Sequence, residues 1–287
     1  MDAPSTMEVR HNAPYRSIRS GPHQRGTIIN VTRTTPARLS QEDILSLIDG
    51  TALAVHVPGF VPAEALAPAR RKLIDHPDRG ALTQATEFQR IGYAYSEVHD
   101  DASREHYHHQ ARAGIQRMRE LFAPYASPSD VLRLLLEETW QAGAHLMHMD
   151  GRKAFVGICR YQHKDVDLNP HTDALERNLP AGHALHLKAQ LSANIYLNIP
   201  RTGGELELWG TEPGEEVYGR LMGGRTWGID RARIGPPAQV VKPAPGDLLL
   251  LNPRRIHAVR PSGDEPRITL GHFIGYYGTA RPLELWS

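Results

Sequence analysis

Residues 246–273 read GDLLLLNPRRIHAVRPSGDEPRITLGHF and carry the clearest indication of the fold. The run Leu248–Leu251 is apolar throughout and has the length of a buried strand. Two further strand-like runs follow, RIHAV and RITLGHF, and residues such as Pro, Gly, Asn and Asp separate them. Several short strands with turn residues between them indicate an antiparallel sheet.

The same pattern of short strand-like runs separated by turn residues continues through the chain after Gly151. Runs rich in β-branched or aromatic residues alternate with short turn sequences, at 153–162, 186–199, 203–210, 239–252, 255–261 and 267–278. This spacing is typical of an antiparallel sandwich or barrel such as a jelly roll. The segment 211–238 contains six glycines and few periodic apolar residues, so we expect a long loop inserted between strands. Long loops of this kind often cover a site.

The first half of the chain has mostly helical periodicity. Ser40-Gln-Glu-Asp43 precedes an apolar stripe and predicts a capped helix that ends near Gly50. A strand is expected at 52–60, and an amphipathic helix at 63–74, where Pro68 is a site of kinking or shortening. Apolar residues recur at helical spacing between about 103 and 142. We therefore expect an α+β protein with a mainly β core and helices packed against one sheet.

The predicted domain organisation is simple. Residues 1–26 are polar and broken by Pro and Gly, which indicates a flexible N-terminal arm. Residues 27–287 form one expected domain, in which 27–150 supply mostly helical support and 151–287 the jelly-roll core, with the loop insertion 211–238.

Composition narrows the classes of function. The 33 basic and 32 acidic residues nearly balance, which argues against recruitment of nucleic acid or an anionic membrane and suits a small-molecule substrate. Cys159 is the only cysteine, which excludes an internal disulfide and a thiolate metal cluster and agrees with a cytoplasmic location. No secretory signal or bilayer-spanning apolar run is found. Nothing in the sequence indicates the oligomeric state.

A histidine and an aspartate two residues apart are candidate metal ligands, but this spacing occurs five times. The pairs are His76/Asp78, His99/Asp101, His148/Asp150, His163/Asp165 and His171/Asp173. Only the last two lie among predicted strands, and His171/Asp173 occupies a corner between strands. His163/Asp165 remains the alternative, and an ordinary polar turn remains open for both pairs. The cluster HYHHQ at 106–110 is a weaker candidate, because adjacent histidines on a helix diverge.

His257 could supply the third ligand of a mononuclear iron site, which needs two histidines and one carboxylate on one face of the metal. It follows the apolar strand at 248–251 and precedes Arg267 by ten residues. On an extended strand Arg267, Thr269 and Gly271 share one face. An arginine directed into a barrel needs an anion beside it, and a carboxylate ligand would satisfy it.

Taken together, these motifs resemble the Fe(II)/2-oxoglutarate-dependent oxygenases. Their order and spacing are similar to the prolyl-hydroxylase-like branch, and the C-terminal run also resembles bacterial enzymes acting on free amino acids or alkaloids, including the carrier-independent halogenases. The resemblance covers about residues 153–287 and implies a double-stranded β-helix of the jelly-roll or cupin-like kind. The matching motifs are Arg160-Tyr161, His171-Thr-Asp173, Tyr196-Leu-Asn198, Gly203-Gly-Glu-Leu206, Gly246-Asp247, His257 and Arg267-Ile-Thr269.

The resemblance implies a role for each matching residue. His171, Asp173 and His257 would be the iron ligands, and Arg267 would hold the distal carboxylate of 2-oxoglutarate, with Thr269 beside it. Further residues expected near this cosubstrate are Tyr161, Tyr196 and Asn194. Packing is an equally open role for the two tyrosines, and a solvent-facing position is open for Asn194.

The implied reaction consumes 2-oxoglutarate and O2, releases succinate and carbon dioxide, and hydroxylates an unactivated C–H bond. Halogenating members of the family carry a small residue in place of the carboxylate ligand, so Asp173 favours hydroxylation over chlorination. An amino acid or a metabolite derived from one is the expected substrate. The alternatives are a desaturase or other oxidative outcome within the family, a cupin-like metal protein that binds or hydrolyses a small carboxylate, and a catalytically inactive interaction domain.

Overall fold

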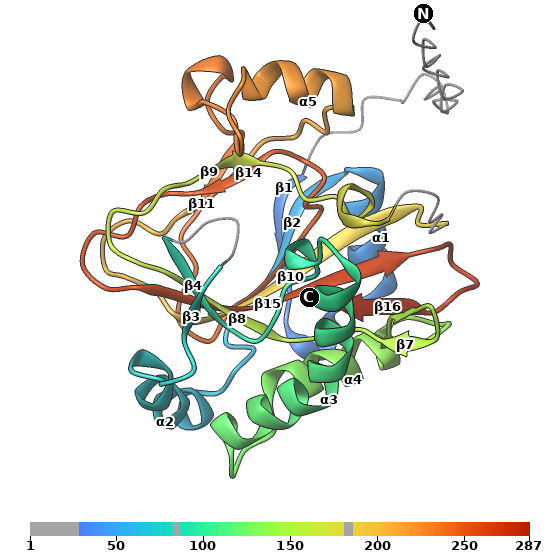
Figure 1. Cartoon of the computed structure of the whole chain (residues 1–287), viewed down its shortest axis with the longest axis vertical. Coiled ribbons are helices and arrows are strands. Elements are labelled where there is room, and N and C mark those ends of the chain that lie inside the picture. The colour runs from blue at the N-terminus through green and yellow to red at the C-terminus, as the bar shows by residue number, and fades with distance from the viewer. Residues whose placement is uncertain (1–28, 83–86, 181–185) are drawn as a thin grey trace, which may run out of the picture.

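The computed structural model describes residues 29–82, 87–180 and 186–287, and the predicted arm at 1–26 lies outside them. The described part is a mixed α+β protein built around a large mixed sheet (Figure 1). Its α-helices are α1 (Gln41–Asp49), α2 (Ala63–Ile74), α3 (Asp101–Phe122), α4 (Pro128–Thr139) and α5 (Glu215–Met222). Short 3-10 helices are η1 (Pro36–Arg38), η2 (Tyr95–Glu97), η3 (Leu175–Asn178) and η4 (Arg231–Arg233).

The larger sheet contains ten strands and runs in the order β1-β2-β13-β10-β15-β8-β4-β3, with β16 against β15 and β5 against β16. Neighbouring strands are antiparallel except in the pairs β1/β2 and β5/β16. Its members are β1 (Ile29–Arg33), β2 (Ala52–Val57), β3 (Gly80–Ala81), β4 (Phe88–Ile91), β5 (Ala144–Leu146), β8 (Ile158–Gln162), β10 (Ala189–Asn198), β13 (Leu248–Leu251), β15 (Arg267–Tyr276) and β16 (Leu283–Trp286).

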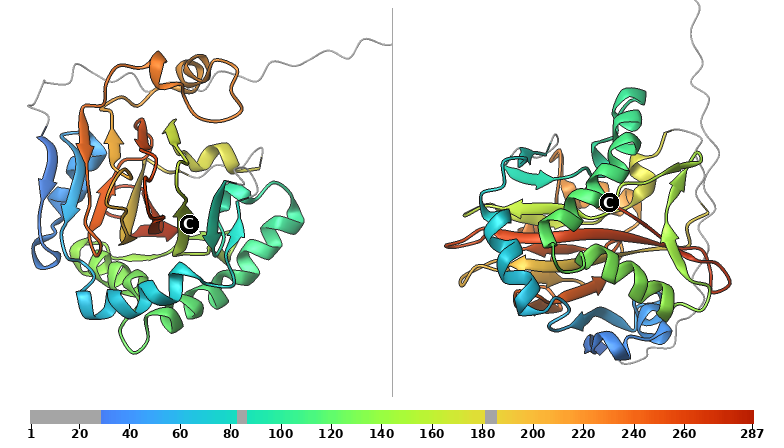
Figure 2. Two further views of the ribbon diagram at one scale, coloured as in Figure 1. Left: turned by 90° about the vertical axis from the view of Figure 1, so that its left-hand side faces the viewer. Right: turned by 90° about the horizontal axis from the view of Figure 1, so that it is seen from below.

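A smaller antiparallel sheet faces the larger one and has the order β12-β11-β14-β9. Its strands are β9 (Leu168–His171), β11 (Leu206–Leu208), β12 (Gln239–Val241) and β14 (His257–Val259). A separate hairpin pairs β6 (His148–Met149) with β7 (Arg152–Lys153). Figure 1 shows α5 above β9, β11 and β14, and α2 at the opposite, lower end of the molecule. Figure 2 shows the same layers from two further directions.

The apolar core is divided by the larger sheet. Side chains of α1 to α4 pack on one face, where they meet alternate strand residues such as Leu248, Leu250 and Ile268. The opposite face carries Leu249 and Leu251, which pack against residues of the smaller sheet. Because successive side chains of a strand point to opposite faces, the run of four leucines in β13 supplies both cores at once. The predicted packing of helices against one sheet is confirmed.

The first predicted helix illustrates how closely local sequence decides an element. The Ser40 hydroxyl accepts a hydrogen bond from the Asp43 N–H, at 3.2 Å, and the Asp43 carboxylate accepts one from the Ser40 N–H, at 3.0 Å. This capping box begins α1, and Gly50 ends it in the left-handed region at φ 87°. The predicted helix at 63–74 is also confirmed, with Pro68 inside it.

The first half is mostly helical and contributes the expected strand β2, and it also contributes strands that the sequence did not predict, since β1, β3 and β4 join β2 in the larger sheet. These short strands have weak patterns of their own, and pairing with neighbouring strands defines them. The insertion at 211–238 is also more ordered than a loop. It contains α5 and η4, and Tyr218 and Ile229 pack with Trp209 and Ile256 in a small apolar cluster.

In the ranges that the structure describes, no helix is both long and apolar enough to cross a membrane.

Candidate metal centre

Strands β9 and β14 bring together two of the predicted ligands. His171 and His257 are directly paired across this antiparallel ladder, and their ring centroids lie 4.3 Å apart. Asp173 follows two residues after His171, and its backbone N–H donates to the Pro253 carbonyl at 2.8 Å. That bond ties the turn after β9 to the turn before β14. The carboxylate is thus held beside both imidazoles.

The three side chains converge through specific atoms. Nε2 of His171 lies 3.8 Å from one carboxylate oxygen of Asp173, and Nε2 of His257 lies 3.5 Å from the other. One ligand atom from each residue can be chosen so that all three lie within 4.8 Å of one another. Two nitrogens and one oxygen at these separations can surround a single ion.

Backbone carbonyls set the orientation of both imidazoles. Nδ1 of His171 lies 2.7 Å from the Asn169 oxygen, and Nδ1 of His257 lies 3.0 Å from the Arg255 oxygen. A carbonyl oxygen can only accept, so each Nδ1 carries the proton and donates it. Each Nε2 then presents a lone pair to the common centre, as metal-binding histidines require.

The electrostatics of the site favour the metal-binding protonation states. Burial, with a smaller effect from His257, lowers the pKa of His171 to about 4. Burial alone would raise the pKa of Asp173, but His171, His257 and Arg160 together hold it well below its usual range. Near neutral pH His171 is therefore neutral and Asp173 is ionised, and no proton need be lost from either when an ion binds.

This donor set fits divalent iron. Two imidazoles and one carboxylate on one side of an ion leave several coordination positions open, which is the arrangement of non-haem iron oxygenases. Only His171, Asp173 and His257, among the residues described, form a group of three or more such donors at metal-binding distances. The alternative pair His163/Asp165 gains no third ligand in the described part of the chain, and the histidines at 106–110 lie along α3 away from any such group.

A cavity of about 460 Å³ adjoins the three residues and lies between the two sheets. This volume is within the range of small-molecule sites. Predicted residues that line it, in addition to the three candidate ligands, are Arg267, Thr269, Asn194 and Tyr161. The cavity can therefore hold a small molecule in contact with a bound ion.

Arg267 begins β15 and is 7% exposed. Its guanidinium lies over the ring of Tyr196, 5.0 Å from the ring centroid, and its Nε has no hydrogen-bond partner among the described residues. Thr269 is buried on the same face of the strand. A buried guanidinium without a carboxylate beside it is a receptor for an anion.

Tyr196 and Asn194 lie on β10 opposite Thr269 and Gly271 of β15, on the face that carries Arg267. The Tyr196 hydroxyl is buried and has no partner in the part of the chain that the structure describes. Burial raises the pKa of Tyr196, against the opposing effect of Arg267. Asn194 donates to the Ser192 hydroxyl at 3.3 Å. Asn194 lines the cavity, whereas Tyr196 packs in the apolar cluster between the sheets, with the guanidinium of Arg267 over its ring.

The structure places Tyr161 differently from the predicted cosubstrate contact. Part of this residue borders the cavity, but its hydroxyl donates to the Leu73 carbonyl oxygen at 2.8 Å and its side chain belongs to the core beneath the helices. The reason is the strand register. Arg160 is paired with Thr269 and shares its face, so Tyr161, the next residue along β8, faces the other way.

Other cavity residues were not identified from the sequence. Arg160 stood in the Arg160-Tyr161 motif without a role, and His272 and Ser192 lie on predicted strands. His272 Nε2 lies 2.9 Å from the Ser129 hydroxyl and its Nδ1 lies 3.2 Å from the Ala193 oxygen. Strand alternation could have placed Arg160 and Ser192 on the cavity face, once one neighbour was known to point there. It would not have found His272, which alternates with Arg267 and Thr269 along β15 and whose ring contacts Ser129 of α4.

The insertion at 211–238 contributes side chains to the cavity wall. Tyr218, Met222 and Trp227 line the cavity, and the Trp227 ring lies 5.0 Å from that of His171. The Ile229 N–H donates to the Pro170 oxygen at 2.7 Å, which fixes the insertion beside β9. The insertion therefore forms one wall of the candidate metal centre.

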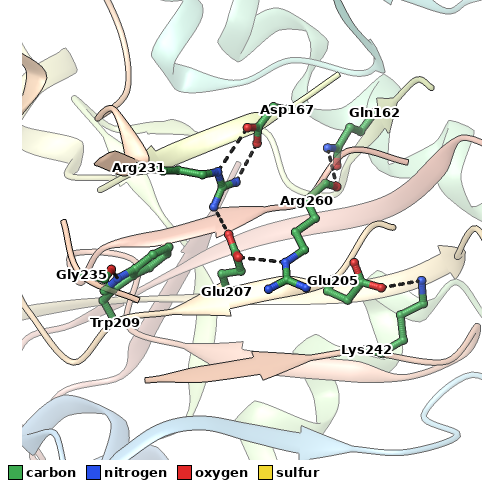
Figure 3. A network of polar contacts seen from close by, with 9 residues as sticks. All are labelled: Gln162, Asp167, Glu205, Glu207, Trp209, Arg231, Gly235, Lys242 and Arg260. Atoms are coloured by element: carbon green, nitrogen blue, oxygen red, sulfur yellow. Dashed lines mark hydrogen bonds and ion pairs between the residues drawn. The ribbon is translucent and has the colours of Figure 1, made fainter. Parts of the chain in front are cut away.

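A charged network holds this wall to the sheet. Figure 3 shows the carboxylate of Glu207 between the guanidinium groups of Arg231 and Arg260, and Arg231 also bonded to Asp167. Arg231 belongs to the insertion, whereas Glu207 lies on β11 and Arg260 follows β14. The Glu207 side chain is 6% exposed, so its charge depends on these two partners.

Comparison with known proteins agrees with this geometry. Residues 32–287 match the family model of the carrier-protein-independent halogenase WelO5. The chain is 28% identical to the L-gamma-glutamyl-L-propargylglycine hydroxylase of Streptantibioticus cattleyicolor over an alignment of 285 residues. The alignment covers 92% of this chain and 98% of that protein.

Solved structures show a related fold. An N-substituted L-amino acid dioxygenase from Burkholderia ambifaria superposes with a TM-score of 0.60 at 14% identity, covering 85% of this chain and 90% of that one. The same enzyme in complex with α-ketoglutarate (2-oxoglutarate) gives a TM-score of 0.56 at 14% identity, covering 86% and 90% of the two chains.

Proposed function

The chain belongs to the family of the carrier-protein-independent halogenase WelO5 and is an Fe(II)- and 2-oxoglutarate-dependent oxygenase, and we propose that it hydroxylates an unactivated C–H bond of an amino acid or an amino-acid-derived metabolite. The convergence of His171, Asp173 and His257 at the wall of the cavity carries this proposal. Each part of the site has a distinct role in it.

His171, Asp173 and His257 hold the iron in this proposal. Both Nε2 atoms and the carboxylate face one point, and carbonyl oxygens fix both rings. Bound iron with 2-oxoglutarate supplies the oxidation of the substrate by O2, with release of succinate and carbon dioxide. The chain's own residues supply the geometry and the cavity, and no side chain need act as a general base.

Arg267 binds the distal carboxylate of 2-oxoglutarate. Its burial without a carboxylate partner among the described residues supports this role, and a planar guanidinium can bind such a group through two hydrogen bonds. Thr269 lies on the same face, and the unpartnered Tyr196 hydroxyl is a further donor beside it. Asn194 contributes a polar side chain to the same wall. The engaged hydroxyl of Tyr161 gives no support to a contact there.

Hydroxylation is favoured over chlorination although the matching family model is that of a halogenase. Asp173 supplies a full carboxylate ligand where the halogenating members are expected to carry a small residue. A carboxylate between both Nε2 atoms occupies the position that a chloride would need. A chain of this family with Asp173 is therefore expected to return oxygen to the substrate.

The relatives support the substrate class. One acts on L-gamma-glutamyl-L-propargylglycine and another on N-substituted L-amino acids, and both substrates derive from amino acids. The cavity volume of about 460 Å³ accommodates molecules of this size. A hydrolytic cupin-like site would give Arg267 no role, so the oxygenase accounts for more of the cavity.

We also propose that the two facing sheets form a double-stranded β-helix within one domain spanning 27–287. Support comes from the shared apolar cluster between the sheets and from a family match that begins at residue 32 and runs to the C-terminus.

The hydroxylase proposal is tested with a panel of amino acids and their acylated or γ-glutamyl derivatives. The enzyme is incubated with Fe(II), 2-oxoglutarate and O2 in chloride-containing buffer, and succinate and product mass are followed together. A product that has gained one oxygen atom is expected. Incorporation of chlorine, or loss of two hydrogens by desaturation, would contradict hydroxylation while leaving the oxygenase assignment intact.

A further inference from the structure

Two arginines, not one, project from the larger sheet into the cavity. Arg160 on β8 is paired with Thr269 on β15, and Arg267 lies two residues before Thr269. In-register neighbours share a face, and the face alternates along each strand. Arg160, Thr269 and Arg267 therefore point to the same side, and all three line the cavity.

The guanidinium groups of Arg160 and Arg267 lie over different aromatic rings of the cavity region. Arg267 lies over the ring of Tyr196, whereas Arg160 reaches to Gly271 and lies over the ring of Phe273, 5.9 Å from its centroid. A Cβ atom added at Gly271 would lie only 2.3 Å from Nη1 of Arg160. The absence of a side chain at 271 thus makes the room in which this guanidinium lies.

Arg160 has no carboxylate partner among the described residues. A third cavity arginine, Arg177, is paired with Glu215 at 2.8 Å. The charge of Asp173 favours the charged form of Arg160 most, and that of Glu97 comes next. Glu97 is itself bound by two guanidinium nitrogens of Arg90, at 2.8 and 2.9 Å. Burial opposes the charge of Arg160, and so does the charge of Arg267. An anion in the cavity would relieve both costs.

The charges around the cavity indicate that 2-oxoglutarate alone does not neutralise the positive charge of the wall and the iron. Apart from the paired Arg177, the charged residues described along its wall are Arg160, Arg267 and Asp173. With a divalent iron they leave a net charge of three positive units. Doubly charged 2-oxoglutarate, bound at the iron and Arg267, leaves one positive unit uncompensated. We assign this unit to Arg160, the second arginine.

We propose that Arg160 binds a carboxylate of the substrate and thereby selects anionic amino-acid derivatives over neutral ones. This inference rests on the proposed function, which assigns Arg267 to the cosubstrate. The surroundings suit such a substrate, because Phe273 and Trp286 form an aromatic wall beside the guanidinium, with ring centroids 5.6 Å apart. A carboxylate can bind Arg160 while an apolar group lies along these rings.

Matched ligands test the assignment. N-acetyl L-amino acids with aliphatic and aromatic side chains are offered as free acids and as their primary amides, which have nearly the same shape without the charge. Binding is measured anaerobically, from the change that each compound causes in the visible absorption of the Fe(II)·2-oxoglutarate enzyme. We expect the acids to bind about tenfold to hundredfold more tightly than the amides, and Arg160→Gln to remove this preference.

Two further variants make the test specific. Gly271→Ala keeps the Arg160 charge but displaces the guanidinium, so it should also lower the affinity for the acids. Arg177→Gln removes a cavity arginine that is already paired with Glu215, and it should keep the preference for acids over amides. Formation of the 2-oxoglutarate complex itself, measured before any probe is added, reports on the proposed function separately.

Three results would overturn the proposal. The first is that no acid of the panel binds better than its amide to the wild-type enzyme. The second is that Arg160→Gln weakens acids and amides equally, which would make Arg160 a positioning residue for Asp173. The third is that Arg160→Gln abolishes 2-oxoglutarate binding to the extent that Arg267→Gln does, which would make both arginines receptors for the cosubstrate.

Discussion

His171 and His257 stand directly opposite each other on β9 and β14, with ring centroids 4.3 Å apart and each Nδ1 bonded to a backbone carbonyl. The centre is thus built into the ladder of the smaller sheet, and its two imidazoles need no loop movement to meet. Asp173 completes the group through a backbone hydrogen bond to Pro253, just before β14.

Removal of Arg267 should separate cosubstrate binding from iron binding. Arg267→Ala is expected to weaken 2-oxoglutarate binding by about tenfold to hundredfold, because a charge-assisted pair is lost, and to change iron affinity little. Both affinities can be measured by anaerobic titration. Arg201→Ala is the matched control, since that side chain is 85% exposed and paired with Asp264. Equal loss of iron and 2-oxoglutarate binding would show that Arg267 only supports the structure.

Asp173→Ala should remove the carboxylate ligand and open a position for chloride. Iron affinity is expected to fall by at least about tenfold, and hydroxylation should be lost. Chloride should alter the absorption of the iron complex in this variant but not in the wild type. Asp165→Asn is the control from the alternative pair, since asparagine tolerates the φ of 62° at that residue. Wild-type hydroxylation by Asp173→Ala would refute its role as a ligand.

The metal-free protein should lose stability as the pH falls from about 6.5 toward 4. Burial lowers the pKa of His272 to about 4, below the value near 6.5 of an unfolded chain. The unfolded state therefore binds more protons in this window, and stability decreases on acidification by up to about 1.4 kcal/mol per pH unit for each such group.

His171, whose pKa is also about 4, contributes in the same direction. Urea unfolding at a series of pH values measures the slope. His272→Gln should reduce the slope without abolishing it, because His171 remains. An unchanged slope in that variant would show that His272 does not titrate on unfolding.

Glu207 should contribute more to stability than its neighbour Glu205 on the same segment. Glu207→Gln removes the buried carboxylate that Arg231 and Arg260 share, and we expect a loss of about 2 kcal/mol in the free energy of unfolding. Glu205→Gln breaks a looser pair with Lys242 at 3.3 Å, and less than about 1 kcal/mol is expected. Similar losses for both variants, measured by urea unfolding, would contradict the importance of the network in Figure 3.

Local signals predicted much of the fold. The capping sequence at Ser40 and the apolar stripe at 63–74 define α1 and α2 almost to the residue. The strands β1, β3 and β4 were not predicted, because neighbours far along the chain stabilise them. Helix α5 was hidden among glycines that flank it, although Tyr218 and Met222 lie at helical spacing.

In the site, too, local sequence predicted some residues, whereas others depend on strand pairing between distant segments. His171 and Asp173 could be selected among five similar pairs, because position between strands singled them out. The role of Arg160 depends on the register of β8 against β15 and on the space left by Gly271. The same register turns Tyr161 toward the helices, away from its expected contact. Which of two adjacent residues faces a cavity is decided by strand pairing, and one sequence carries no direct record of it.

Anaerobic addition of 2-oxoglutarate to the Fe(II)-loaded protein tests the central claim most directly. A weak visible charge-transfer band should appear in the wild type, should be absent in His257→Ala, and should persist in His163→Ala, which alters the alternative pair. Absence of the band in intact wild-type protein would contradict the assignment of His171, Asp173 and His257 as an iron centre that binds 2-oxoglutarate.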